Sequence, residues 1–153
     1  MIIDAHAHIS ETTYGNVKIY LTQLEESGID QGVVVPGGMM DVRKMTDYIT
    51  GRAKPENVEP NNRYIKECCR KHSANIRGFI CLNPHDPNAR EQLEAGFRQG
   101  FRGLKLSPMT HEFSFGSKIV ADGFDSFNSI GEHLTRVGGI PSCQRHTIPM
   151  VGF

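Results

Sequence analysis

The chain has 153 residues, enough for one domain with its own hydrophobic core. Its 17 basic residues balance its 17 acidic ones without long runs of one sign, which argues against a surface for nucleic acid or anionic membrane. No apolar run is long enough to span a membrane or resembles a signal peptide, and the four irregularly spaced cysteines indicate reduced thiols in a cytoplasmic protein.

Short apolar stretches alternate with amphipathic ones over the larger part of the chain. The apolar stretches predict strands at residues 2–9, 31–36, 76–82 and 101–106, and the amphipathic ones predict helices at residues 17–28, 61–72 and 88–99. The strands are almost continuously apolar, as expected where helices cover a parallel sheet. This alternation predicts an α/β fold.

Two further regions have less regular patterns. Residues 39–60 are polar and contain two prolines, so we expect a loop with a short helical piece. Residues 110–128 have weak periodicity, whereas residues 130–137 predict one more helix and residues 139–141 could open a fifth strand.

Two α/β architectures fit this alternation of strands and helices. A (β/α)8 barrel of TIM type typically needs ~250 residues, and this chain supplies four clear units and a doubtful fifth. The sequence therefore predicts a partial TIM-type barrel of about four to five strand–helix units of parallel sheet. A complete doubly wound open sheet would fit the length equally well.

The first predicted strand carries the residues that point most directly to chemistry: Asp4, His6 and His8. Successive side chains of a strand alternate between its faces, so we expect these three on one face. The two histidines would lie roughly 6.6 Å apart along the strand, close enough for both imidazoles to bind one divalent metal ion. Asp4 could orient one of these ligands. The alternative is a pair of half-buried polar residues at a strand end.

Three stretches of the sequence resemble a known family. Residues 2–9 (IIDAHAHI), 78–84 (GFICLNP) and 100–108 (GFRGLKLSP) resemble, in this order, the first, third and fourth strands of the amidohydrolase superfamily. They look closest to its branch of aminocarboxymuconate-semialdehyde decarboxylase-like enzymes. We therefore interpret the chain as a single domain, residues 1–153, that resembles the N-terminal half of such a barrel. Its family-like part is residues 1–108, and the remainder is divergent or truncated.

The resemblance implies an eight-stranded barrel that holds one or two divalent metal ions and catalyses hydrolysis or non-oxidative decarboxylation. The first-strand histidines of the family match His6 and His8. The family also has a histidine ligand at the end of strand five, for which His146 is the candidate here. Residues 142–145 before it are polar where the family has an apolar strand, and the family's strand-eight Asp has no counterpart. We expect zinc, with manganese or iron as alternatives, and a small-molecule substrate such as a carboxylate.

Lys105 is the candidate catalytic residue on the fourth predicted strand. Its apolar neighbours would face the other way, which places the lysine in the barrel interior near the carboxyl end of the strand. A lysine there is costly unless it is paired or deprotonated. It could pair with a substrate carboxylate, be carboxylated to bridge two metal ions, or form a structural ion pair, for instance with Asp4. We interpret His85 and His111, which follow strand ends, as loop residues.

Three functions remain open on the sequence alone. The first is a metal-dependent hydrolase or decarboxylase of amidohydrolase type, truncated and with impaired activity because the strand-eight Asp is absent. The second is a non-catalytic half-barrel whose open sheet edges make it a homo-oligomer. The third is an unrelated small α/β binding domain whose His-x-His is incidental.

Overall fold

The computed structural model describes residues 1–56 and 58–113. The four strands are β1 (Ile3–Ile9), β2 (Gln31–Pro36), β3 (Ile76–Cys81) and β4 (Gly103–Lys105). The three longer helices are α1 (Val17–Glu26), α3 (Asn62–Lys71) and α4 (Ala89–Arg98). Three short helical pieces are η1 (Val42–Lys44), α2 (Met45–Ile49) and α5 (Pro108–His111). The predicted strands and helices are confirmed in this part of the chain to within a few residues at their ends.

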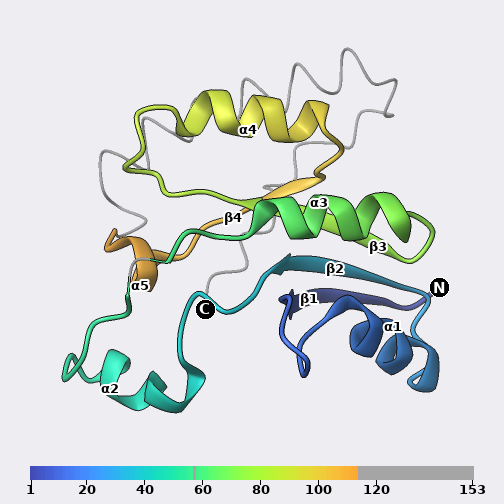
Figure 1. The fold of residues 1–153 in the computed structure, drawn as a ribbon, viewed down its shortest axis with the longest axis horizontal. Coiled ribbons are helices and arrows are strands. Elements are labelled where there is room, and N and C mark those ends of the chain that lie inside the picture. The colour runs from blue at the N-terminus through green and yellow to red at the C-terminus, as the bar shows by residue number, and fades with distance from the viewer. Residues whose placement is uncertain (57, 114–153) are drawn as a thin grey trace.

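The four strands form one parallel sheet in the order β1-β2-β3-β4, with a helix in the connection after each of the first three (Figure 1). A doubly wound sheet reverses its strand order at a switch point and carries helices on both faces. Here the strand order follows the chain without reversal. The sheet is therefore built like the first half of a (β/α)8 barrel, as predicted.

The helices α1, α3 and α4 pack on the same side of the sheet. One hydrophobic cluster contains Leu24 of α1, Ile65 of α3 and Leu93 of α4, together with strand residues such as Val34 and Ile80. Ile65, Leu93 and Val34 are fully buried. Burying an aliphatic side chain of this size stabilises the fold by about 1.5–3 kcal/mol. The other face of the sheet is thus left for residues that do not belong to this core.

Asparagine side chains begin two of the helices. The Asn16 side-chain oxygen accepts hydrogen bonds from the backbone N–H groups of Lys18 and Ile19, at 3.1 and 3.2 Å. The Asn61 side chain caps α3 in the same way through the N–H of Tyr64. The first backbone N–H groups of a helix have no partner within the helix, and such caps stabilise its start by about 1 kcal/mol.

The region between β2 and α3 forms a long connection that contains η1 and α2, as the sequence predicted. The helix expected at residues 130–137 and the strand expected at residues 139–141 lie outside the described residues. No helix in the described part of the chain is long and apolar enough to cross a membrane.

The packing of α1 on the sheet depends on a glycine in β2. Gly32 pairs in register with Asp4 of β1, and a Cβ atom on Gly32 would overlap the hydroxyl oxygen of Tyr20 and lie 2.8 Å from its Cζ atom. The same hydroxyl donates a 2.8 Å hydrogen bond to the Asp4 carboxylate. Only glycine leaves room for this bond beneath α1.

We predict that Gly32→Ala lowers the free energy of unfolding by about 1–3 kcal/mol, because the added methyl group overpacks the space that the Tyr20 ring occupies. Urea denaturation followed by circular dichroism measures the change. In a Tyr20→Phe background the hydroxyl is gone, and the same substitution should cost less. If Gly32→Ala lowered the free energy of unfolding equally in wild type and in Tyr20→Phe, the result would contradict this packing.

Candidate metal centre at the carboxyl end of the sheet

Register and packing define the inner face of the sheet, the face opposite the helix-side core. Val34 and Ile80 belong to that core, so their strand neighbours Val35 and Cys81 face the other way. Val35 is paired with His8, and Cys81 with Lys105. Paired residues of parallel strands share a face, so His8 and Lys105 both lie on the inner face. This placement agrees with the interior position that the sequence predicts for Lys105.

His6 and His8 lie close together on β1. Their ring centroids are 4.8 Å apart, and the ring planes are tilted by 48°. The Nε2 atom of His6 is buried and has no hydrogen-bond partner among residues 1–56 and 58–113. An unpaired buried nitrogen costs about 1–3 kcal/mol, and a metal ion is one species that would satisfy it. Two neighbouring imidazoles, one with a free inward nitrogen, fit the histidine part of a divalent-metal site.

The surroundings of both rings favour the neutral imidazole, the form that binds a metal ion. Burial lowers the pKa of His6, the charge of Lys105 lowers it further, and Asp4 opposes the shift. Burial also lowers the pKa of His8, as do His6 and Lys105, while a hydrogen bond to the Pro36 carbonyl raises it.

The structure corrects the prediction that Asp4 shares a face with the two histidines. The β1–β2 register shifts between Asp4 and Ala7, because β1 uses one residue more than β2 over this stretch. Asp4 therefore faces α1, where its carboxylate accepts the hydrogen bond from Tyr20. It also accepts a 3.1 Å bond from the backbone N–H of His6. Asp4 thus supports the backbone at His6 and is not on the face that carries the imidazoles.

Lys105 is a buried cation without a counter-charge in the described part of the chain. It is 9% exposed, and none of the ion pairs among residues 1–56 and 58–113 includes it. The suggested ion pair with Asp4 is not formed. Burial lowers the pKa of the Lys105 amine, and the nearby Cys81 thiol opposes this shift. Burial in turn raises the pKa of Cys81 to about 12, so this thiol stays neutral and does not balance the lysine charge.

His111 is better buried than the sequence suggested. It ends α5, the short helix after β4, and is 4% exposed with its Nδ1 atom unpaired. Burial lowers its pKa, Glu59 raises it and His85 lowers it. The only sequence signal was its place just after the Ser107-Pro108 pair that ends the fourth strand. Its burial depends on contacts with segments distant in sequence.

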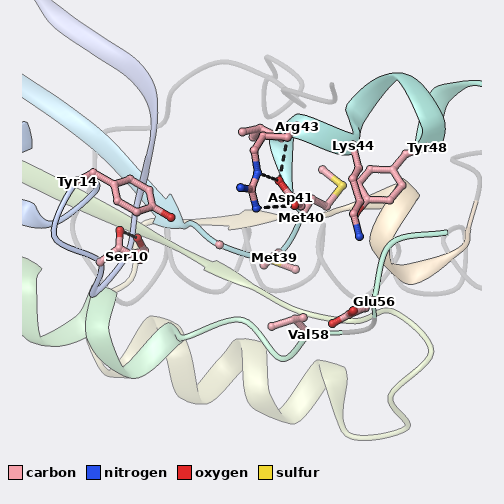
Figure 2. A pocket seen from close by; sticks show the side chains of 13 residues that line it. Ser10, Tyr14, Met39, Met40, Asp41, Arg43, Lys44, Tyr48, Glu56 and Val58 are labelled. Carbon is pink, nitrogen blue, oxygen red and sulfur yellow. Dashed lines mark hydrogen bonds and ion pairs between the residues drawn. The ribbon is translucent and has the colours of Figure 1, made fainter. Parts of the chain in front are cut away.

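The loops after β1 and β2 enclose a cavity of about 690 Å³ at the carboxyl ends of these strands (Figure 2). Its walls include Ser10 and Tyr14 from the first loop and Lys44 and Tyr48 from the second. Arg43 also lines it, but its guanidinium is engaged by Asp41 in two 2.9 Å hydrogen bonds. Neither His6 nor His8 lines this cavity. Barrel enzymes place their active sites at this end of the strands.

The described residues supply part of a metal site. No group of three or more His, Cys, Asp or Glu side chains is arranged to hold a metal ion among residues 1–56 and 58–113. His146, the candidate third ligand, lies outside the described residues. The geometry thus brings together His6 and His8 with Lys105 in electrostatic reach, and it does not test His146.

We predict that Lys105→Met raises the free energy of unfolding by about 1–3 kcal/mol at pH 7, because it removes a buried charge that lacks a partner. The folded-state pKa of Lys105 lies below the unfolded value of roughly 10.4. Its burial cost is therefore full below the folded pKa and disappears as the pH rises to the unfolded value. The increase in the free energy of unfolding caused by Lys105→Met should accordingly become smaller as the pH approaches 10. Denaturation of wild type, Lys105→Met and the exposed control Lys71→Met measures this, and a destabilised Lys105→Met would contradict it.

Several solved structures are similar to this fold, whereas no protein-family model and no curated protein matches the sequence. An amidohydrolase II structure has a TM-score of 0.62 at 14% identity, and the match covers 85% of this chain and 48% of that one. A probable 2-pyrone-4,6-dicarboxylic acid hydrolase from Acinetobacter baumannii, with citric acid bound, has a TM-score of 0.56 at 15% identity. That match covers 84% of this chain and 46% of the hydrolase.

A third similar structure is 5-carboxyvanillate decarboxylase from Novosphingobium aromaticivorans, with bound manganese and 3-methoxy-4-hydroxy-5-nitrobenzoic acid. Its TM-score is 0.58 at 12% identity, over 86% of this chain and 49% of the decarboxylase. The chain thus spans about half the length of the structures it matches. Its fold is thus similar to about half of the fold of these enzymes, in agreement with the partial barrel that the sequence predicts.

Proposed function

We propose that this chain provides the first two ligands of a divalent-metal site, His6 and His8, in an enzyme of amidohydrolase type. The reaction class is hydrolysis of a C–N or C–O bond or a related metal-assisted decarboxylation. The observation that carries the proposal is the buried, unpaired Nε2 atom of His6 next to the His8 ring on the inner face. Most buried side-chain nitrogens in proteins have a hydrogen-bond partner, and a metal ion would satisfy this one.

The ligand set allows zinc, manganese or iron, because imidazole binds all three. Zinc is our first expectation from the residue types. Manganese has separate support, since it is bound in the 5-carboxyvanillate decarboxylase structure. When bound, the metal ion would supply Lewis acidity toward a water molecule or a substrate oxygen.

The surroundings of His8 keep its ring in the form that binds a metal ion. Burial and the charges of His6 and Lys105 lower its pKa, and the interaction with the Pro36 carbonyl only partly opposes this. His6 is held through its backbone, where its N–H donates to Asp4. Asp4 in turn accepts the hydroxyl of Tyr20, so α1 fixes this end of β1.

We propose that Lys105 pairs with a carboxylate of the substrate. The lysine is buried on the inner face, has no counter-charge in the described part of the chain, and influences both histidines electrostatically. A bound carboxylate would offset the desolvation of the ammonium group. The citrate and nitrobenzoate in two similar structures are carboxylates as well. The substrate would thus be a small carboxylic acid held between Lys105 and the histidine pair.

The remaining ligands of the site are a separate part of this proposal. His146 is our candidate for the third ligand, from the same chain. A second copy of the chain is the other source of ligands, in line with the homo-oligomer expected from the sequence.

The metal content of the purified protein tests this function. We predict that elemental analysis after reconstitution with zinc or manganese finds near-stoichiometric metal in wild type and in His72→Ala, whose histidine lies at the end of α3. The double variant His6→Ala/His8→Ala should lose at least about tenfold in metal affinity, because two imidazole ligands are removed. Circular dichroism shows whether the variants are folded.

A metal content that is the same in wild type and the double variant would overturn the metal site. With metal bound, turnover of aromatic carboxylic acids, followed as released carbon dioxide, tests the reaction class. Lys105→Met should then raise the KM for a carboxylate substrate while the metal content stays unchanged.

A further inference from the structure

A second cavity, of about 410 Å³, lies at the opposite end of the sheet from the histidine pair. It is lined by residues at the start of β3, by the segment that precedes β4, and by one side of α3. Strands of a parallel sheet begin at the same edge, so this cavity is at the amino edge, whereas His8 is near the carboxyl end of β1. The proposed metal site does not involve it.

Four cationic side chains surround this cavity. Lys66 and Arg70 are four residues apart on α3 and thus share one side of the helix. Arg77 comes from β3, and Arg102 immediately precedes β4. No Asp or Glu is among the described residues that line the cavity. Three separate elements therefore bring four positive charges to one place in a chain whose net charge is zero.

These four cations have no carboxylate partner in the described part of the chain. Arg77 donates to the backbone carbonyls of Ser73 and Ile76, which positions its guanidinium but leaves its charge uncompensated. Some exposed cations elsewhere in the described part of the chain are paired, as Arg43 is with Asp41 and Lys54 with Glu112, whereas others such as Lys71 are not. Like charges held close together repel one another, and a bound anion would relieve this repulsion.

The rest of the cavity wall suits a small organic anion. Ile76 and Phe101 are among its lining residues, and their side chains are almost fully buried in the core behind the wall. Cys69 also contributes to the wall, and burial raises the pKa of its thiol to about 11, so it adds no negative charge. The volume falls within the range of small-molecule sites. Two or more arginines with forked donors match phosphate oxygens better than a single carboxylate.

We propose that this amino-edge cavity binds a small molecule that carries a diphosphate group. Lys66, Arg70, Arg77 and Arg102 contact the phosphate oxygens, and the organic part occupies the remaining volume of the cavity. The site is independent of the proposed metal centre, which lies at the other end of the sheet.

Calorimetric titration with inorganic pyrophosphate, at a fixed ionic strength near 0.1 M, tests the proposal. Arg70→Gln should raise the Kd roughly tenfold, the expected loss for one charge-assisted hydrogen bond. Lys71→Gln is the matched control, because it removes the same charge from the next residue of α3 but does not line the cavity. The control should change the Kd less than about twofold. A parallel titration with ADP shows whether an organic group adds affinity.

NMR amide shifts locate the bound anion. Pyrophosphate should shift the amides of Gln99, Gly100 and Arg102, which border the cavity, and should leave those of β1 unchanged. The proposal is overturned if neither pyrophosphate nor ADP binds saturably. It is also overturned if Arg70→Gln and Lys71→Gln weaken binding equally, since that would indicate a diffuse electrostatic attraction. Tighter binding of a long oligonucleotide that pyrophosphate fails to displace would likewise exclude a small-molecule site.

Discussion

The additional residue in β1 between Asp4 and Ala7 is the constraint on which the candidate metal centre depends. Strict alternation would put Asp4 on the same face as the two imidazoles. The shift instead turns Asp4 toward α1, where it accepts hydrogen bonds from Tyr20 and from the backbone of His6. The glycine at position 32 leaves room for this arrangement. One local irregularity thus anchors the strand on its helix side and leaves its inner face to His6 and His8.

The inner face holds polar groups whose burial is not offset within the described part of the chain. Among the described residues, His6 has a buried nitrogen without a hydrogen-bond partner, and Lys105 is a buried side chain without a counter-charge. Both features cost stability in the free protein. A divalent cation and a carboxylate would satisfy one feature each, which is why these two residues together favour a carboxylate-processing metal site. The same reasoning applies at the other end of the sheet, where four cations that have no carboxylate partner among the described residues favour an anion.

The sequence predicts most of this architecture but only part of its sites. Periodicity and caps locate the strands and helices, and the inner position of Lys105 follows from its apolar neighbours. The bulge in β1 escapes prediction, because the alternation of Asp4, His6 and His8 is also compatible with a regular strand. The burial of His111 and the cation cluster around Arg70 also escape it, since both depend on segments that only the folded sheet brings together.

X-ray absorption spectroscopy of the zinc-loaded protein tests the central claim most directly, because it detects the atoms bound to the metal. With His6 and His8 as ligands, the spectrum should contain imidazole scattering from at least two rings, with zinc–nitrogen distances of about 2.0–2.1 Å. That signal should be lost in His6→Ala/His8→Ala. Zinc coordinated only by oxygen, or an identical imidazole signal in the double variant, would contradict a metal site on the first strand.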